Sequence, residues 1–284
     1  MRRPRAADGA EIRIETFGVR ILVRVQPHSL AARVRSRLPA GPRFPETRRP
    51  DVSYRVALRP APEGSSIGDL FRGGRILVAG ADPETLLDAL ESDLERFVAE
   101  RARRVIFIHA GAVGWQGKAI LLPGRSRSGK TTLVAALVRA GGLYLSDEFA
   151  VLDAEGWVHP FPRRLGIRGE DGDSGRISAT ALGGRVGRRP LRLGRMLALD
   201  YKPGSPWRLQ SLSPGQAAMA LLEHTVAARA RPRTALAVLA RAVGDVSAWR
   251  GERGEAGAFA EALLRGRLPE RPPLVRARET KLVL

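Results

Sequence analysis

The sequence predicts an α/β protein, with a smaller β-rich region of residues 1–103 followed by a larger domain of residues 104–284. Three observations support this prediction. Short stretches within residues 1–80 alternate apolar and polar residues, as strands with one buried face do. Apolar runs at 105–109 and 118–123 are typical of strands that are covered on both faces. The last third of the chain repeats apolar residues at helical spacing, which predicts a helical C-terminal part.

Composition places the chain among ordinary globular proteins. It has 284 residues, of which 44% are hydrophobic and 27% charged, so it is long enough for two domains and too apolar to be disordered. It contains no cysteine and only four histidines, which excludes disulfides, thiolate nucleophiles and cysteine-based zinc sites. We see no apolar run of about 18 residues and no signal-peptide core, and we therefore expect a cytoplasmic protein without a membrane partner.

The formal net charge of +19 raises the question of nucleic-acid binding. Only four of the 48 basic residues are lysines, and the arginines are spread through an Ala-, Gly- and Pro-rich chain. Aromatic residues make up 5% of the chain and do not interleave with the basic runs, so the stacking surfaces of single-strand and RNA binders are missing. We therefore interpret the charge as a solvated basic surface rather than a nucleic-acid interface.

The N-terminal region is predicted to end in a helix over residues 82–103. Asp82 can cap the first amides, Pro83 suits the first helical position, and the leucines that follow have helical spacing. The strands expected before it are 11–15, 19–25, 52–58 and 74–79. None of them carries an acid–base or metal-binding pattern, so we expect this region to be structural or to serve recognition.

The centre of the chain contains the pattern G-x-x-x-x-G-K-[ST] between an apolar strand and a helix that stops at Gly141-Gly142. In this context the glycines let the backbone amides approach phosphate oxygens, Lys130 reaches the β- and γ-phosphates, and the Thr131 hydroxyl can ligate Mg²⁺. The pattern predicts a phosphate-binding loop (P-loop) that uses ATP and Mg²⁺. The predicted nucleotide-binding residues are Gly124, Arg125, Ser126, Arg127, Ser128, Gly129, Lys130, Thr131 and Thr132.

Two carboxylates, Asp147 and Glu148, directly follow the next predicted strand, 143–146. If this strand lies in a parallel sheet beside 118–123, both acids reach the edge where the P-loop begins. One could then hold Mg²⁺ while the other accepts a proton from an attacking hydroxyl; the alternative is a cap or a solvated turn. His109 closes the earlier strand, and it is either a packed turn residue or a partner of the base.

Several stretches together resemble the HPr serine kinase/phosphorylase superfamily, specifically its shorter HPr-kinase-related members. The resemblance covers about residues 105–168 and rests on Phe107-Ile108-His109-Ala110-Gly111, the P-loop, Tyr144-Leu145-Ser146-Asp147-Glu148 and His159-Pro160-Phe161-Pro162-Arg163. It implies a P-loop kinase domain related to phosphoenolpyruvate carboxykinase, which transfers the ATP γ-phosphate to a serine hydroxyl. Leu212-Ser213-Pro214-Gly215-Gln216-Ala217 resembles the start of the C-terminal helix of those relatives more weakly.

The resemblance also assigns roles to residues. It implies that Asp147 is the catalytic base, that His109 is the family's histidine and that Glu148 is the second acid of the family's acid pair. With Lys130 from the loop in the catalytic set, Thr131 and Glu148 are the expected metal ligands. Two residues depart from the family pattern, because Arg127 replaces a usual third glycine and Glu148 replaces a usual aspartate. The family's glycine-rich signature after the acid pair is not found, so we do not expect dual kinase/phosphorylase action on HPr. Members of the family are often multimeric, so a homo-oligomer is one expectation, while the residues themselves leave the oligomeric state open.

Residues 163–190 are rich in glycine and arginine, and we expect them to form a mobile loop, either a surface insertion or a flap over the phosphates. The favoured function is an ATP-dependent kinase that acts on a hydroxyl, with serine in a protein or peptide as the expected acceptor. A small-molecule kinase would use the same residues. A nucleotide-dependent binding or switch protein with little transfer activity is the alternative from another class.

Overall fold

The structure is a computed structural model that describes residues 8–125, 128–168 and 174–267. It divides into two compact units, 1–105 and 106–284. The division lies close to the boundary that the sequence predicts near residue 103. We describe each unit by itself. Among the described residues, no helix is both long enough and apolar enough to cross a membrane.

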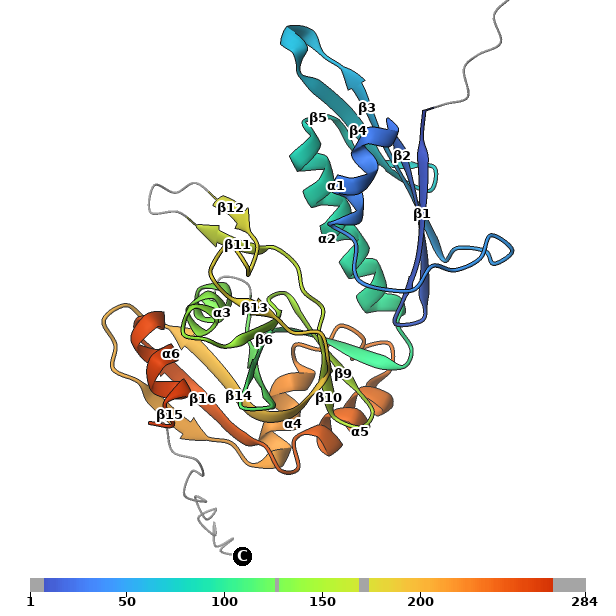
Figure 1. Cartoon of the computed structure of the whole chain (residues 1–284). Helices are drawn as coiled ribbons and strands as arrows, with labels where there is room; N and C mark the ends of the chain where they lie inside the picture. The colour runs from blue at the N-terminus through green and yellow to red at the C-terminus, as the bar shows by residue number, and fades with distance from the viewer. Residues whose placement is uncertain (1–7, 126–127, 169–173, 268–284) are drawn as a thin grey trace, which may run out of the picture. The chain divides into compact units, whose positions relative to one another are not determined.

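The N-terminal unit is a five-stranded sheet in the order β1-β2-β3-β4-β5 (Figure 1). Its strands are β1 (Ala10–Thr16), β2 (Val19–Gln26), β3 (Val52–Pro60), β4 (Ser66–Arg72) and β5 (Arg75–Ala81). Only the β2–β3 pair is parallel, and the other pairs are antiparallel. Its helices are α1 (Ala31–Arg35) and α2 (Pro83–Arg101), with single 3₁₀ turns at His28–Leu30 and Pro62–Gly64.

The helix α2 confirms the predicted helix and its cap. Asp82 Oδ1 accepts hydrogen bonds from the amides of Glu84 and Thr85 at 2.9 and 3.0 Å, which satisfies two of the free amides of the first turn. The face of α2 that carries Leu86, Leu90 and Leu94 is fully buried. All four strands predicted for this region are also confirmed, as β1, β2, β3 and β5, whereas β4 was not predicted.

The second unit is built on a nine-stranded sheet in the order β13-β8-β6-β9-β10-β14-β16-β15, with β7 paired to both β6 and β14. Its strands are β6 (Val105–Trp115), β7 (Lys118–Pro123), β8 (Leu143–Ser146), β9 (Phe149–Asp153), β10 (Trp157–His159), β13 (Arg185–Val186), β14 (Leu191–Tyr201), β15 (Arg208–Ser211) and β16 (Ser247–Arg253). A separate hairpin joins β11 (Leu165–Arg168) to β12 (Ser174–Ile177).

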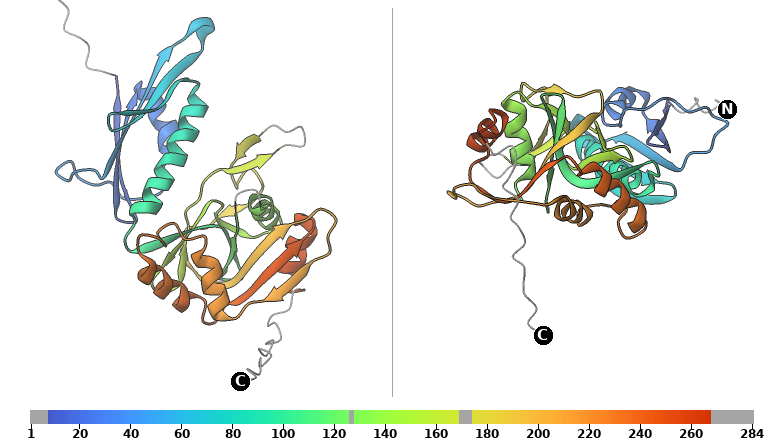
Figure 2. Two further views of the ribbon diagram at one scale, coloured as in Figure 1. Left: turned by 180° about the vertical axis from the view of Figure 1, so that it is seen from behind. Right: turned by 90° about the horizontal axis from the view of Figure 1, so that it is seen from below.

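Helices cover both faces of this sheet. They are α3 (Lys130–Arg139), α4 (Pro214–Leu222), α5 (Pro232–Ala242) and α6 (Ala256–Leu264). One core cluster joins α3 and α6 to alternate residues of the strands, such as Val113 and Leu197. A second cluster joins α4 and α5 to the strand residues that alternate with those of the first cluster, such as Ala112 and Met196. The two pairs of helices therefore lie on opposite faces, as Figures 1 and 2 show.

The sheet corrects the expectation of parallel strands. The strand that was predicted to end at residue 109 continues to Trp115 and pairs with β7 and β8 in antiparallel fashion. Since β7 and β8 both run against β6, they run in the same direction, and their carboxyl ends reach the same edge. The expected edge therefore forms in a mixed sheet. The glycines of β6 hide its length in the sequence, because Gly111 and Gly114 add no apolar side chain to the pattern.

Two further expectations are corrected in the C-terminal half. Residues 163–190 were predicted as a loop, but the described part contains the β11–β12 hairpin and β13, with Leu165 and Ala179 buried. The third of the chain that was predicted as helical also contributes β14, β15 and β16 to the sheet. In both places, glycine and arginine residues interrupt the alternation of apolar and polar residues by which a strand is predicted from sequence. The strands form because pairing with their neighbours satisfies the backbone hydrogen bonds.

Candidate functional site

The carboxyl ends of β7 and β8 meet at one edge of the sheet, where a cavity of about 740 Å³ opens. The loop that follows β7 and the acid pair that follows β8 both lie there. His109 lies at the same edge, because its neighbour Ala110 pairs with Pro123 at the end of β7. The predicted site residues that line the cavity are His109, Gly124, Arg125, Gly129, Lys130, Thr131, Thr132 and Glu148. Ser126 and Arg127 lie outside the described residues.

The loop of residues 124–129 joins β7 to α3 as the sequence predicts. Gly129 adopts the left-handed region (φ +80°) and caps α3, which begins at Lys130. The Lys130 ammonium turns back and donates to the carbonyl oxygens of Gly124 and Arg125 at 2.8 and 2.7 Å. The amides of the first turn of a helix have no partner within the helix, so this end of α3 presents positive charge and free donors to the cavity.

Tight packing explains the glycines of this loop. A Cβ atom at Gly124 would lie 2.7 Å from Oγ of Ser128, so a larger residue there would require the Ser128 side chain to move. The Ser128 hydroxyl itself is buried without a hydrogen-bond partner in the structure. Ser128 therefore supports the loop from beneath and does not line the cavity.

Asp147 is 5% exposed and lies beneath the cavity. Its carboxylate is hydrogen-bonded to Thr131, while its Oδ1 atom is buried without a partner. Burial raises the pKa of Asp147 to about 6, against the opposing effects of the Thr131 bond and of the positive charges on Arg163 and Lys130. A carboxylate that is desolvated in this way, with one oxygen unsatisfied, is a candidate ligand for a cation.

Glu148 instead faces the cavity, with its side chain 48% exposed. Its Oε1 atom is 3.6 Å from Nδ1 of His109, and this contact is the main reason why the pKa of Glu148 lies below its usual value. The His109 ring is held by the ring of Phe149, with their centres 4.6 Å apart. Burial lowers the pKa of Lys130, although Glu148 and Asp147 both oppose that shift.

Two residues near the loop were not found by sequence reasoning, because they come from β14 and β16. Arg253 is 1% exposed and donates to the carbonyl oxygen of Gly129 at 2.8 Å and to that of Gly254 at 2.8 Å. Tyr201 lines the cavity, and its hydroxyl donates to Glu255 at 2.9 Å. The strands β14 and β16 run parallel to β7, so their carboxyl ends reach the same edge.

Three more residues complete the site. His224 lines the cavity, and its carbonyl oxygen accepts a hydrogen bond from the amide of His109. Burial lowers the pKa of His224, and the nearby charges of Lys130 and Arg125 act in the same direction. Arg163 is close enough to Asp147 and Glu148 to lower the pKa of both carboxyls. Gly166 lines the cavity from β11, within the segment that was expected to be a loop.

Comparison with known proteins adds little to this geometry. No family model matches the chain, and no curated protein is similar to it in sequence. Among solved structures, it is similar to the HPr(Ser) kinase/phosphatase from Coxiella burnetii. The similarity covers 57% of this chain and 95% of that chain, with 14% sequence identity and a TM-score of 0.29. A similarity this weak assigns neither a fold family nor an activity, so the assignment of function depends on the geometry of the site.

Proposed function

We propose that this protein is an ATP-dependent kinase that transfers the γ-phosphate to a hydroxyl, with a serine of a protein or peptide as the acceptor. The observation that carries the proposal is the meeting of Thr131 with Asp147, and of Glu148 with His109, beside a glycine-rich loop that begins a helix. Phosphoryl transfer depends mainly on positioning and on charge stabilisation, and these groups supply both.

The phosphate-binding part of the proposal rests on the loop and on Lys130. The free amides at the start of α3 and the dipole of that helix favour an anion at this position. The Lys130 ammonium now donates to two loop carbonyls, and it would exchange these bonds for bonds to the β- and γ-phosphates. Arg253 adds a buried positive charge behind Gly129, where it has no ion-pair partner among the described residues.

The residues also fit a magnesium ion. Thr131 and Asp147 supply a hydroxyl and a carboxylate, which are ligands that Mg²⁺ prefers, and the unsatisfied Oδ1 of Asp147 is available to it. When bound there, Mg²⁺ would neutralise charge on the β- and γ-phosphates. Among the described residues, no group of three or more histidine and acidic side chains is arranged so that it could hold a metal ion by itself, and the nucleotide would therefore supply further ligands.

This geometry favours exchanging the roles that the family resemblance implies for the two acids. Asp147 is buried against Thr131, so it suits the metal, whereas Glu148 is exposed in the cavity, where an acceptor can reach it. Glu148 would accept the proton of the acceptor hydroxyl as the hydroxyl oxygen bonds to the γ-phosphorus. The bond between that phosphorus and the β–γ bridging oxygen then breaks, and ADP leaves. His109 would stabilise the carboxylate before transfer and hold it in position.

The first experiment is a transfer assay with γ-labelled ATP and Mg²⁺ in a lysate of the source organism. We expect a labelled species with the wild-type protein and with the control variant Glu155→Gln, which changes an exposed turn residue of the same unit. Lys130→Ala should abolish the label, because it removes the cation that holds the transferred phosphate. A label that is confined to small molecules would favour a small-molecule kinase.

The Mg²⁺ dependence of the transfer rate in two variants distinguishes the roles of the two acids. Asp147→Asn should raise the Mg²⁺ concentration needed for half-maximal rate by at least about tenfold. Glu148→Gln should lower kcat by about 10² to 10⁴, the usual contribution of a general base, with little change in Mg²⁺ dependence. The opposite pattern would restore the roles implied by the resemblance. Nucleotide binding that depends on Lys130, without transfer to any acceptor, would refute the kinase and favour a nucleotide-dependent switch.

A further inference from the structure

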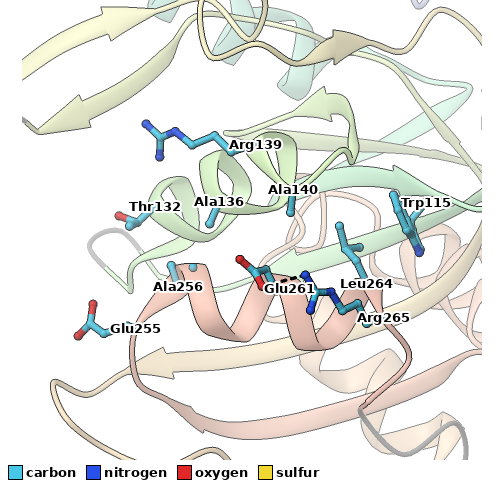
Figure 3. Close-up of a pocket in the computed structure, with 11 residues that line it drawn as sticks. Trp115, Thr132, Ala136, Arg139, Ala140, Glu255, Ala256, Glu261, Leu264 and Arg265 are labelled. Atoms are coloured by element: carbon cyan, nitrogen blue, oxygen red, sulfur yellow. Dashed lines mark ion pairs between the residues drawn. The ribbon is translucent and has the colours of Figure 1, made fainter.

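A second cavity, of about 660 Å³, lies between α3 and α6 (Figure 3). Its volume is within the range of small-molecule sites, roughly 300 to 1,000 Å³. Thr132 and Arg139 line both this cavity and the one that contains Lys130 and Glu148, so the two adjoin along α3. The side chains proposed to act in phosphate transfer, such as those of Lys130 and Glu148, do not line the second cavity.

The small side chains that line the second cavity leave room for a flat ring. Ala136 of α3 and Ala140, the C-cap residue of that helix, line it four residues apart, and Ala256 and Leu264 of α6 line it as well. Trp115 lies at the end of the cavity that is far from Thr132 (Figure 3). Eight residues of helix separate the position of Thr132 from that of Ala140, which is about 12 Å and long enough for a purine with its ribose. Small side chains on α3 leave room for the ring to pack against the helix.

The charged groups that line this cavity are two carboxylates and two guanidiniums, those of Arg139 and Arg265. Glu255 and Glu261 both line it. Glu261 forms an ion pair with Arg265 at 3.3 Å, which holds its carboxylate in place, and Glu255 accepts from the Tyr201 hydroxyl. An ionised carboxylate only accepts hydrogen bonds, so it would recognise a donor on the ring, such as the amino group of a purine.

The residues of the first cavity fix the direction in which the proposed triphosphate would bind. The γ-phosphate would lie toward Lys130, Glu148 and His109, where transfer takes place. The α-phosphate must then lie at the other end, toward Thr132, and the nucleoside must continue beyond it. Because Thr132 also lines the second cavity, the nucleoside would enter the space between α3 and α6.

We therefore propose that the cavity between α3 and α6 binds the purine base and ribose of the nucleotide, and that Glu261 recognises an amino group of the base. This inference rests on the proposed function, because it assumes a triphosphate at the loop. It adds a site for specificity that lies outside the sequence motif, and it gives α6 a role in choosing the nucleotide.

Calorimetry with two ligands tests the proposal. Inorganic triphosphate with Mg²⁺ uses only the loop, whereas ATP with Mg²⁺ uses both cavities. Ala136→Leu or Ala140→Leu should fill the second cavity and weaken ATP binding at least about tenfold, with triphosphate binding unchanged. The matched control is Ala240→Leu on the exposed side of α5, which should alter neither affinity. Two filling variants are used so that poor folding of one does not decide the result.

A third ligand tests recognition of the amino group. Purine riboside triphosphate lacks this group, and wild-type protein should bind it more weakly than ATP. Glu261→Gln should reduce that difference, and GTP in place of ATP distinguishes a guanine site from an adenine site.

The outcomes separate the two proposals. If wild-type protein binds both triphosphate and ATP, and the filling variants affect the two ligands equally or not at all, the nucleoside lies elsewhere and only this inference fails. If wild-type protein binds neither ligand, the proposed function fails, and this inference fails with it.

Discussion

The burial of Asp147 predicts that this carboxylate destabilises the metal-free protein at neutral pH. Its pKa is about 6 in the folded protein and 3.8 in an exposed chain, a difference of about two units. Since one unit corresponds to about 1.4 kcal/mol, the ionised carboxylate costs about 3 kcal/mol at pH 7. Between about pH 4 and pH 6 the folded state binds more protons than the unfolded state, so the free energy of unfolding falls as pH rises.

The substitution Asp147→Asn removes this titration and keeps a similar shape. The free energy of unfolding of the variant, minus that of the wild type, should increase by up to about 3 kcal/mol as the pH rises from about 4 to 7.5. Tryptophan fluorescence during urea unfolding is a suitable assay, because all four tryptophans lie in the second unit. The experiments contain a chelator and no nucleotide, so that neither Mg²⁺ nor phosphate stabilises the ionised form.

Comparing the two pH values cancels any constant effect of the amide, such as a poorer bond to Thr131. Asp200→Asn, at an exposed carboxylate of β14, serves as the matched control and should give a pH-independent difference. A variant whose stability relative to wild type is the same at both pH values would refute the reasoning, because Asp147 would then not be desolvated.

Two other substitutions test features found only in the structure. Arg253→Met should weaken binding of inorganic triphosphate at least about tenfold in calorimetry, because it removes the buried charge that holds the Gly129 carbonyl; unchanged affinity would exclude that role. Gly184→Ala should cost about 1 to 3 kcal/mol in urea unfolding, because its Cβ would lie 2.1 Å from Cγ1 of Val138, whereas the control Gly175→Ala meets no atom within 4 Å. Equal effects of the two alanines would show that the segment is not packed against α3.

Local chemistry in the sequence predicts the glycine-rich loop and the start of α3 well. Gly129 has the positive φ that a glycine tolerates, and Lys130 begins the helix directly after it. Ser213 caps α4 and forms the reciprocal bonds of a capping box with Gln216. Each of these features depends on residues that are neighbours in the chain, so the sequence contains the information needed to predict them.

The rest of the site depends on how distant strands pair. Arg253 contacts Gly129 across 124 residues of chain, and no local pattern predicts that contact. The strand β16 reaches the loop only because it pairs with β14, which in turn pairs with β7. His224 joins the site for a similar reason, since a backbone bond connects it to His109.

The sequence by itself determined that a glycine-rich loop and two acids follow neighbouring apolar strands, because side-chain type and spacing decide such local elements. Only the tertiary structure decided that Asp147 lies against Thr131 and that Glu148 faces His109. The two acids are adjacent in the chain and chemically similar, so their sequence positions do not distinguish their environments. Burial and neighbouring charge do, because they raise the pKa of one carboxyl and lower that of the other.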